Sequence, residues 1–291
     1  MLKKWYREYL SLLKMIEVEE ILDLIFYRPL AFILVKTVQR TNVTPNQITF
    51  VAIIWALIGA VLYTENFLIL SGIFFILYDV FDCADGMVAR LKKNGTPLGR
   101  VIDGFADYIA TIAAYLAIGF GFANNTTNPQ LYWGLIVLAG ASNIFHAISL
   151  DYYRNRYLDY ALDRKSTFEE DLKEYREDYN KLKETPGHYF SKLLYVIYFA
   201  YSKLQAKLTA KKDVELKKVY KKEAFLKANK VPIKLWTFIG PTTEWTLLLV
   251  CVMTGKLEIF IWGMIIVLNI YAIIMHLFQS YIDSKTEKIN L

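Results

Sequence analysis

The sequence predicts an all-α, polytopic membrane protein with about six transmembrane helices. Three observations support this: hydrophobic residues make up 55% of the 291-residue chain, they gather in long runs, and basic residues gather on alternate connections between those runs. A transmembrane helix needs about 20 mostly apolar residues, and several stretches meet that requirement. A soluble all-α protein with buried helices is the alternative, but it would need amphipathic faces that these runs mostly lack.

The expected spans cover about residues 46–64, 67–89, 98–122, 131–150, 238–253 and 257–278. The fifth span carries Pro241 and Glu244 in its first turns. These boundaries divide the chain into four regions: an N-terminal interfacial segment (1–45), spans one to four with the candidate site (46–150), a cytoplasmic or interfacial helical insertion (151–235), and spans five and six with a short tail (236–291).

Two of these regions are expected to lie at the membrane surface. Residues 1–14 alternate charged and apolar side chains, which is typical of an amphipathic interfacial helix, and they show no signal-peptide cleavage site. The insertion carries 20 Lys and Arg against 13 Asp and Glu. Its middle part, about 189–208, is apolar enough to lie in the interface. A seventh span there would break the charge alternation.

The basic residues also predict the orientation of the chain. Lys and Arg concentrate before span one, between spans two and three, in the insertion and in the tail, whereas the opposite connections carry almost none. Under the positive-inside rule, both termini and the polar ends of spans two and three are cytoplasmic. The positive charge is expected to attract anionic lipid, and nucleic-acid binding is not expected because the charge is confined to the membrane-facing side.

Four aspartates at the cytoplasmic ends of spans two and three are the candidate functional residues. Asp82 and Asp85 are three residues apart, and Asp103 and Asp107 are four apart, so each pair shares a helix face. A short turn makes the two helices antiparallel neighbours, which directs both pairs into one cavity. Carboxylates this close repel one another, and a divalent cation relieves the repulsion. Oxygen ligands favour magnesium, manganese or calcium over zinc.

The residues between the aspartates indicate a phosphate ligand. Gly86 and Ala89 leave room for a ligand to approach the helix, and Arg90 is a natural phosphate contact. A structural ion-pair network is one alternative, but Arg90 alone cannot neutralise four carboxylates. A channel or cation transporter with an intramembrane acidic site is another, and it does not explain the Gly-x-x-Ala-Arg pattern.

The pattern D-x2-D-G-x2-A-R-x8-G-x3-D-x3-D resembles the signature of the CDP-alcohol phosphotransferase (CDP-alcohol phosphatidyltransferase) family. Every specified residue and spacing of the signature is present: Asp82, Asp85, Gly86, Ala89, Arg90, Gly99, Asp103 and Asp107. The sequence TPNQIT, which opens span one and includes Asn46, is similar to the start of that span in the family. The long insertion after span four departs from the compact members of the family.

The resemblance implies a role for each matched residue. Asp82, Asp85 and Asp103 would be metal ligands, while Asp107 would help to hold metal and act as the general base. The cofactor would be Mg²⁺ or Mn²⁺, with two ions expected and Ca²⁺ able to occupy or inhibit the site. The residues expected against the CDP portion of the donor are Asn46, Asp82, Gly86, Ala89, Arg90 and Gly99. A homodimer is also implied.

The implied reaction transfers a phosphatidyl group from CDP-diacylglycerol to the hydroxyl of a small polar alcohol and releases CMP. Inositol phosphate, glycerol phosphate and serine are the acceptors considered. The reverse partition, in which a CDP-choline or CDP-ethanolamine head group is donated to a lipid alcohol, fits the signature equally well. Arg100, Arg154 and Arg156 near the cytoplasmic mouth are candidate acceptor contacts, or they simply obey the positive-inside rule. His146, Cys83 and Cys251 are expected to be packing residues.

Overall fold

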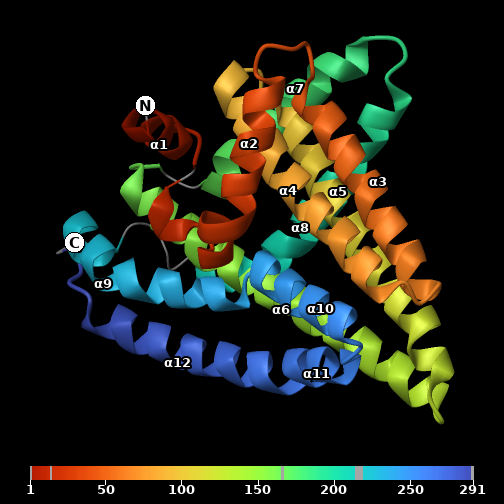
Figure 1. Cartoon of the computed structure of the whole chain (residues 1–291). Coiled ribbons are helices and arrows are strands. Elements are labelled where there is room, and N and C mark those ends of the chain that lie inside the picture. The colour runs from red at the N-terminus through yellow and green to blue at the C-terminus, as the bar shows by residue number, and fades with distance from the viewer. Residues whose placement is uncertain (1, 14, 165–166, 214–218, 290–291) are drawn as a thin grey trace.

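The computed structural model describes residues 2–13, 15–164, 167–213 and 219–289, and Figure 1 shows that helices account for nearly all of this part of the chain. Tyr220 and Lys288 form an isolated antiparallel bridge. The α-helices are α1 (Leu2–Ser11), α2 (Arg28–Val38), α3 (Pro45–Thr64), α4 (Leu68–Lys92), α5 (Pro97–Gly121), α6 (Pro129–Ala161), α7 (Thr167–Glu184), α8 (Tyr189–Asp213), α9 (Lys222–Trp236), α10 (Pro241–Thr254), α11 (Leu257–Trp262) and α12 (Asn269–Lys285). Short 3-10 or π segments are η1 (Ile16–Val18), η2 (Asp23–Tyr27), η3 (Ala123–Asn125), η4 (Thr237–Ile239) and η5 (Gly263–Leu268).

Five helical stretches in the described residues are long and apolar enough to cross a membrane: Pro45–Thr64, Pro97–Asn125, Pro129–Ala161, Lys222–Thr254 and Leu257–Lys285. The second expected span, α4, is comparably long at 25 residues, but it carries Asp79, Asp82 and Asp85 from its middle onward. The expected fifth span corresponds to α10, which has 14 residues and follows α9 through η4. The prediction of an all-α polytopic membrane protein is confirmed.

Proline and capping residues set the starts of the helices around the candidate site. Thr44 forms a capping box with Gln47 at the start of α3, and the Thr96 side chain accepts a hydrogen bond from the Gly99 amide at the start of α5. Helix α4 ends at Lys93, whose backbone is left-handed with φ 52°. The tight α4–α5 connection between Lys93 and Thr96 places the second half of α4 beside the first half of α5.

Small residues allow α3, α4 and α5 to pack closely (Figure 1). Ala52 and Ala56 of α3 and Ala110 of α5 are fully buried around Tyr78 of α4. Further along, a Cβ on Gly59 would lie 2.9 Å from the Phe75 ring. Small side chains at helix interfaces let two helix backbones approach closely. Within a membrane this close packing drives association, because the surrounding lipid is as apolar as the side chains and the hydrophobic effect contributes little.

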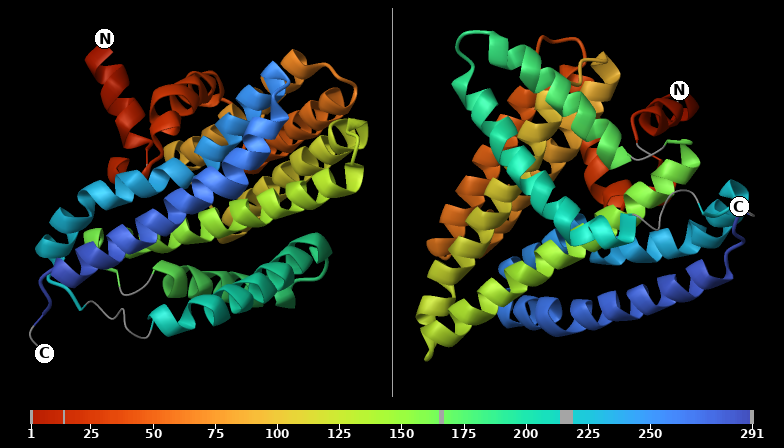
Figure 2. Two further views of the ribbon diagram at one scale, coloured as in Figure 1. Left: turned by 90° about the horizontal axis from the view of Figure 1, so that it is seen from below. Right: turned by 180° about the vertical axis from the view of Figure 1, so that it is seen from behind.

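A second group of helices, α6, α9, α10 and α12, crosses the first at an angle and meets it through α6 and α10 (Figures 1 and 2). Trp236 of α9 lies in its core and stacks on Tyr153 of α6 with ring centroids 4.4 Å apart. Helix α10 joins the two groups because Trp245 packs against Phe75 and Tyr78 of α4. The space between α4, α5, α6 and α10 is where the candidate site lies.

Residues 167–213 of the predicted insertion form the α7–α8 hairpin, which packs on the first half of α5 (Figure 2). Tyr175, Leu194 and Tyr195 are buried there against Val101. Residues 151–161 instead continue α6 and residues 222–235 belong to α9, so both ends of the predicted insertion lie within candidate membrane spans. Within the described residues, the apolar stretch of α8 covers Tyr189–Ala200. Its outer face exposes Tyr189, Phe190 and Leu193. The side chains from residue 204 onward in the expected interfacial stretch lie outside the described residues, as do residues 1 and 14 of the expected N-terminal helix.

Candidate metal centre and adjoining cavity

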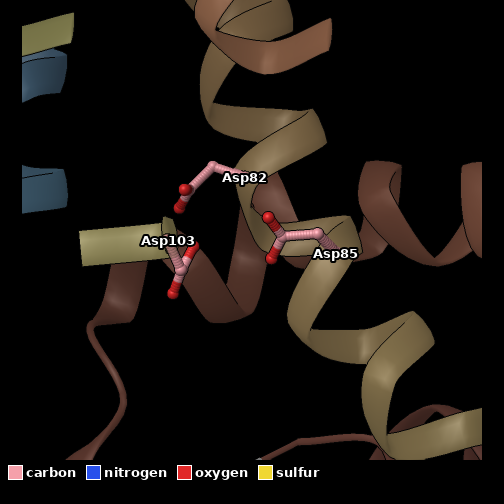
Figure 3. A group of neighbouring side chains, drawn as sticks. All are labelled: Asp82, Asp85 and Asp103. Atoms are coloured by element: carbon pink, nitrogen blue, oxygen red, sulfur yellow. The ribbon is translucent and has the colours of Figure 1, made fainter. Parts of the chain in front are cut away.

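Three of the four motif aspartates meet at one point. Asp82 and Asp85 on α4 and Asp103 on α5 each direct a carboxylate oxygen into a common space, and these oxygens lie within 4.8 Å of one another (Figure 3). The α4–α5 connection brings the two helices together in this register. The spacing of the aspartates predicted one cluster of four, whereas the structure groups three of them and leaves Asp107 outside. We call these three residues the carboxylate cluster.

The carboxylate cluster suits a divalent cation. Asp85 is buried, and Thr49 of α3 donates a hydrogen bond to its Oδ2. Asp82 Oδ1 is also buried, and it has no hydrogen-bond partner among the described residues. A buried carboxylate oxygen without a donor is costly, and a bound cation would satisfy it. Three carboxylates supply the hard oxygen ligands that Mg²⁺ and Mn²⁺ prefer.

Asp107 lies one helical turn beyond Asp103 and is not one of the three clustered residues. The Tyr78 hydroxyl donates a hydrogen bond to Asp107 Oδ1 at 2.9 Å. Tyr78 itself is buried between α3, α5 and Trp245. This contact fixes the orientation of the carboxylate at the edge of the cluster, and sequence reasoning did not identify it.

The residues expected against the CDP portion lie at the start of α3, the start of α5 and the end of α4. A Cβ on Gly99 would lie 3.2 Å from Asn46 Oδ1, so Asn46 and Gly99 are direct neighbours. The Arg90 guanidinium lies beside Gly86, and its Nε donates to the Leu12 carbonyl at 2.5 Å. Ala89 lies near Gly95 in the α4–α5 connection. Asn46 and Gly99 thus lie together where α3 and α5 begin, and Gly86 and Arg90 lie together near the end of α4.

A cavity of about 570 Å³ opens from the cluster between α4, α5, α6 and α10. Acidic side chains line one end, including Asp79, Asp82 and Asp107. Aliphatic and aromatic side chains line most of the remainder: Ile112, Leu116, Trp133, Ile136, Val137, Ile144, Leu248 and Phe260. The cavity therefore joins a charged end to a long apolar compartment, and we call it the main cavity.

Asp79 is a buried acidic residue of the main cavity that the motif does not contain. It lies one turn before Asp82 on the same helix, and its Oδ2 has no hydrogen-bond partner among the described residues. The three-residue spacing from Asp79 to Asp82 to Asp85 is visible in the sequence.

An N-terminal charged network packs against α4 and the start of α10. Arg28 pairs with Glu19 at 2.7 Å, and Asp23 accepts hydrogen bonds from Thr242 Oγ1 at 3.1 Å and from the Cys83 thiol at 3.7 Å. Cys83 is thus buried, as expected for a packing residue, and it also contacts this network. The second cysteine, Cys251, is buried in the apolar core.

Glu20 belongs to the same network. Its carboxylate accepts hydrogen bonds from the Thr243 amide and hydroxyl and lies 3.8 Å from Arg154. Burial raises the pKa of Glu20 to about 8, although Arg154 acts in the opposite direction. Gly240 allows this approach, because a Cβ there would lie 2.2 Å from the Glu20 carboxyl carbon. The N-terminal segment is therefore part of the packed bundle as well as a surface element.

The three candidate acceptor arginines occupy different environments. Arg100 pairs with Glu174 and lies over the Tyr175 ring of the insertion. Arg154 lies between Asp151 and Glu20. Arg156 is buried and paired with Asp283 at 2.6 Å. It lines a second, small cavity that is separate from the main cavity. Among the described residues that line the main cavity, none of the three appears.

Comparison with known proteins supports the resemblance carried by the motif. Residues 42–158 match the family model described as CDP-alcohol phosphatidyltransferase. This segment contains all of α3, α4 and α5 and nearly all of α6, and with them the carboxylate cluster, Asp107 and the surface around Gly99. The family resemblance that the motif suggested is thereby confirmed for this segment.

A named relative makes the similarity more specific. The chain is 31% identical over 96 residues to a phosphatidylinositol phosphate synthase of Corynebacterium glutamicum. The aligned region covers 33% of this chain and 44% of that relative, so the chain matches less than half of the relative's length.

Proposed function

We propose that this protein is a membrane-embedded, metal-dependent transferase that moves a phosphatidyl group from CDP-diacylglycerol to the hydroxyl of a small polar alcohol. The observation that carries the proposal is the carboxylate cluster at the charged end of an otherwise apolar cavity. A CDP-linked lipid has the matching form, since its pyrophosphate is anionic and its chains are apolar. The family match over residues 42–158 supports the same reaction class.

The carboxylate cluster would hold Mg²⁺ or Mn²⁺ through Asp82, Asp85 and Asp103. When bound, such ions neutralise pyrophosphate charge and stabilise the attacking and leaving oxygens. Asn46, Gly86, Ala89, Arg90 and Gly99 would contact the CDP portion. Arg90 supplies a positive charge there, and the missing side chains at Gly86 and Gly99 let a nucleotide approach the helix backbones.

Asp107 would be the general base. The acceptor hydroxyl oxygen forms a bond to the phosphorus that bears the lipid alcohol, the bond from that phosphorus to the CMP oxygen breaks, and the hydroxyl proton passes to Asp107. The Tyr78 hydrogen bond to Oδ1 holds the carboxylate at the cavity wall. Asp82 and Asp107 both line the main cavity, so the base faces the same space as the cluster.

Inositol phosphate is the acceptor we propose first, because the named relative is a phosphatidylinositol phosphate synthase. Glycerol phosphate and serine are the competing acceptors. Arg100 and Arg154 are more suitable acceptor contacts than Arg156, since their side chains are partly exposed whereas Arg156 is almost completely buried against Asp283.

The site would face the cytoplasm, with both termini on the same side, and the protein would act as a homodimer. The support for the orientation is the concentration of Lys and Arg on the side where α4 ends and α5 begins. The support for the dimer is the family resemblance alone. Cysteine labelling in sealed vesicles tests the orientation, and mass measurement in native nanodiscs tests the dimer.

A substrate panel tests the proposed reaction. Purified protein is supplied with CDP-diacylglycerol and one alcohol at a time, and separately with CDP-choline or CDP-ethanolamine and diacylglycerol. We expect CMP and a new phospholipid in the first set, with inositol phosphate the best acceptor. Products only in the second set would show that the protein transfers a CDP-linked head group to a lipid alcohol instead. Transport of divalent cations across the membrane, with no CMP release in either set, would favour the cation-transporter alternative.

A further inference from the structure

A group of polar residues interrupts the apolar wall of the main cavity. Thr111 and Tyr115 of α5, Asn143 of α6 and Glu244 of α10 all line it, beyond the acidic end. At 1.5 Å per residue, Thr111 lies about 6 Å and Tyr115 about 12 Å along α5 from Asp107. We call these four residues the polar belt. Polar groups at membrane depth are costly, which makes them functional candidates.

Glu244 is the fixed centre of the polar belt. Only 2% of it is exposed, its Oε1 lies 2.5 Å from His146 Nδ1, and its Oε2 accepts from Asn143 Nδ2 at 2.5 Å. His146 Nε2 lies 3.1 Å from Asn269 Oδ1, and Asn269 Nδ2 donates to Ser142 at 2.8 Å. Both oxygens of Glu244 are therefore engaged within the protein. The network holds Asn143 in one orientation at the cavity wall.

Two hydrogen-bond donors of the polar belt are left for a ligand. The Tyr115 hydroxyl is buried and has no hydrogen-bond partner among the described residues, although the residue lines the main cavity. Its ring is held by Phe260, with centroids 6.0 Å apart, and packs over Gly140, whose added Cβ would lie 3.6 Å from it. Asn143 uses one N–H of its amide on Glu244, and an amide nitrogen carries two.

We infer that the polar belt recognises the linkage oxygens of the donor lipid, the ester or ether atoms that join its chains to glycerol. This inference rests on the proposed function. With the pyrophosphate at the carboxylate cluster and the chains among Trp133, Ile136 and Val137, where α6 meets the far part of α5 near Gly119, the linkage region must lie between them. Linkage oxygens are acceptors without protons, which complements the Tyr115 hydroxyl and the second Asn143 N–H.

The inference assigns Tyr115 and Asn143 as residues that position the CDP-linked lipid, with Glu244 and His146 as the support of Asn143. None of these lies in the signature, and Glu244 lies outside residues 42–158. Selectivity between CDP-linked lipids follows because a buried hydroxyl left without a hydrogen-bond partner costs free energy. A CDP-linked lipid that lacks linkage oxygens leaves the buried Tyr115 hydroxyl without a partner.

The test compares two donors in the full-length protein: CDP-diacylglycerol, and CDP joined to one saturated long-chain alcohol, which has no linkage oxygens. Tyr115→Phe should lower kcat/KM for CDP-diacylglycerol about 5–10-fold, as expected for one lost hydrogen bond, through KM more than kcat. It should change kcat/KM for the alkyl donor less than twofold. Tyr132→Phe, which removes a hydroxyl bonded to Glu258 outside the cavity, is the matched control and should change neither.

A binding measurement separates this inference from the proposed reaction. Short-chain diacylglycerol should raise the unfolding midpoint of wild-type protein in detergent more than a fatty alcohol of equal carbon number does. Tyr115→Phe should remove that difference, whether or not CMP is ever released. An equal effect of Tyr115→Phe on both lipids, or no effect on either, would overturn the inference. Absence of CMP release from wild type with an intact binding difference would instead refute only the proposed reaction.

Discussion

The Tyr78 hydroxyl donates a hydrogen bond to Asp107 Oδ1 at 2.9 Å and connects α4 to α5 beside the carboxylate cluster. Tyr78 is packed against Trp245 of α10, so the orientation of Asp107 depends on three helices. A base that is held in place by a buried donor loses less entropy when it accepts a proton in the reaction. Asp107 and Tyr78 therefore act as a pair in this account.

Asp107→Asn should abolish turnover while leaving metal-dependent donor binding measurable. The amide retains the size of the carboxylate and can still accept from Tyr78, but it cannot take the acceptor proton. We expect kcat to fall by at least about 100-fold. Steady-state CMP release measures turnover, and calorimetry with Mg²⁺ and donor measures binding. Activity like that of wild type would remove Asp107 from the base role.

Tyr78→Phe should reduce kcat about 5–10-fold with little change in the KM of either substrate, because only the orientation of Asp107 is disturbed. Tyr63→Phe is the matched control, since Tyr63 is another buried tyrosine on the neighbouring helix α3. A change in KM alone would instead indicate that Tyr78, which also lines the main cavity, contacts a substrate.

Asp82→Ala should lose both metal binding and activity, because Asp82 belongs to the carboxylate cluster and lines the main cavity. Asp79→Asn, one turn away, should retain Mn²⁺ binding, since Asp79 is not one of the clustered residues. Titration of Mn²⁺ followed by electron paramagnetic resonance distinguishes the two variants. Equal loss of Mn²⁺ in both would require Asp79 to be a ligand.

Glu20→Gln should change how stability depends on pH. The folded pKa of Glu20 is about 8 against an ordinary value of 4.5, so the folded state binds more protons between these values. Stability of the wild type should therefore fall as the pH rises from about 5 to about 9, and Glu20→Gln should flatten that fall. Differential scanning fluorimetry measures both. Glu177→Gln on the exposed face of α7 is the control, and a flattening of equal size there would contradict the assignment.

Arg156→Met should destabilise the protein and leave the acceptor KM within about twofold, because it breaks a buried pair with Asp283. Arg100→Met should do the reverse, raising the acceptor KM several-fold with a small effect on the unfolding midpoint, since its pair with Glu174 is exposed. If Arg156→Met raised the acceptor KM selectively, the acceptor site would have to extend to α12.

Local patterns were enough to predict the carboxylate cluster, because Asp82, Asp85 and Asp103 depend on helix periodicity and one short turn. The partners that complete the site could not be predicted in this way. Thr49 and Tyr78 reach the aspartates through the packing of α3, α4 and α5, and neither stands out in an apolar run. In the sequence, Glu244 is distinguished only as an acidic residue in the first turns of an otherwise apolar span. Its pairing with His146, 98 residues away in sequence, depends on how α6 and α10 pack.

In the insertion, too, local patterns predicted the helices but not how they pack. Charge and hydropathy predicted that it is helical, whereas its docking on α5 through Tyr175 and Tyr195 required the three-dimensional fold. The charged N-terminal segment was predicted as an interfacial element. Glu20 and Asp23 nevertheless lie buried among α4, α6 and α10. Their hydrogen-bond and ion-pair partners there are Thr242, Thr243 and Arg154, which lie far along the chain.

The most direct test of the central claim is CMP release from CDP-diacylglycerol by purified protein in lipid nanodiscs, with inositol phosphate present and Mg²⁺ or Mn²⁺ added after chelation. The account predicts no CMP without metal, restoration on adding either ion, and no restoration in Asp82→Ala. CMP release that is unaffected by chelation, or that persists in Asp82→Ala, would contradict it.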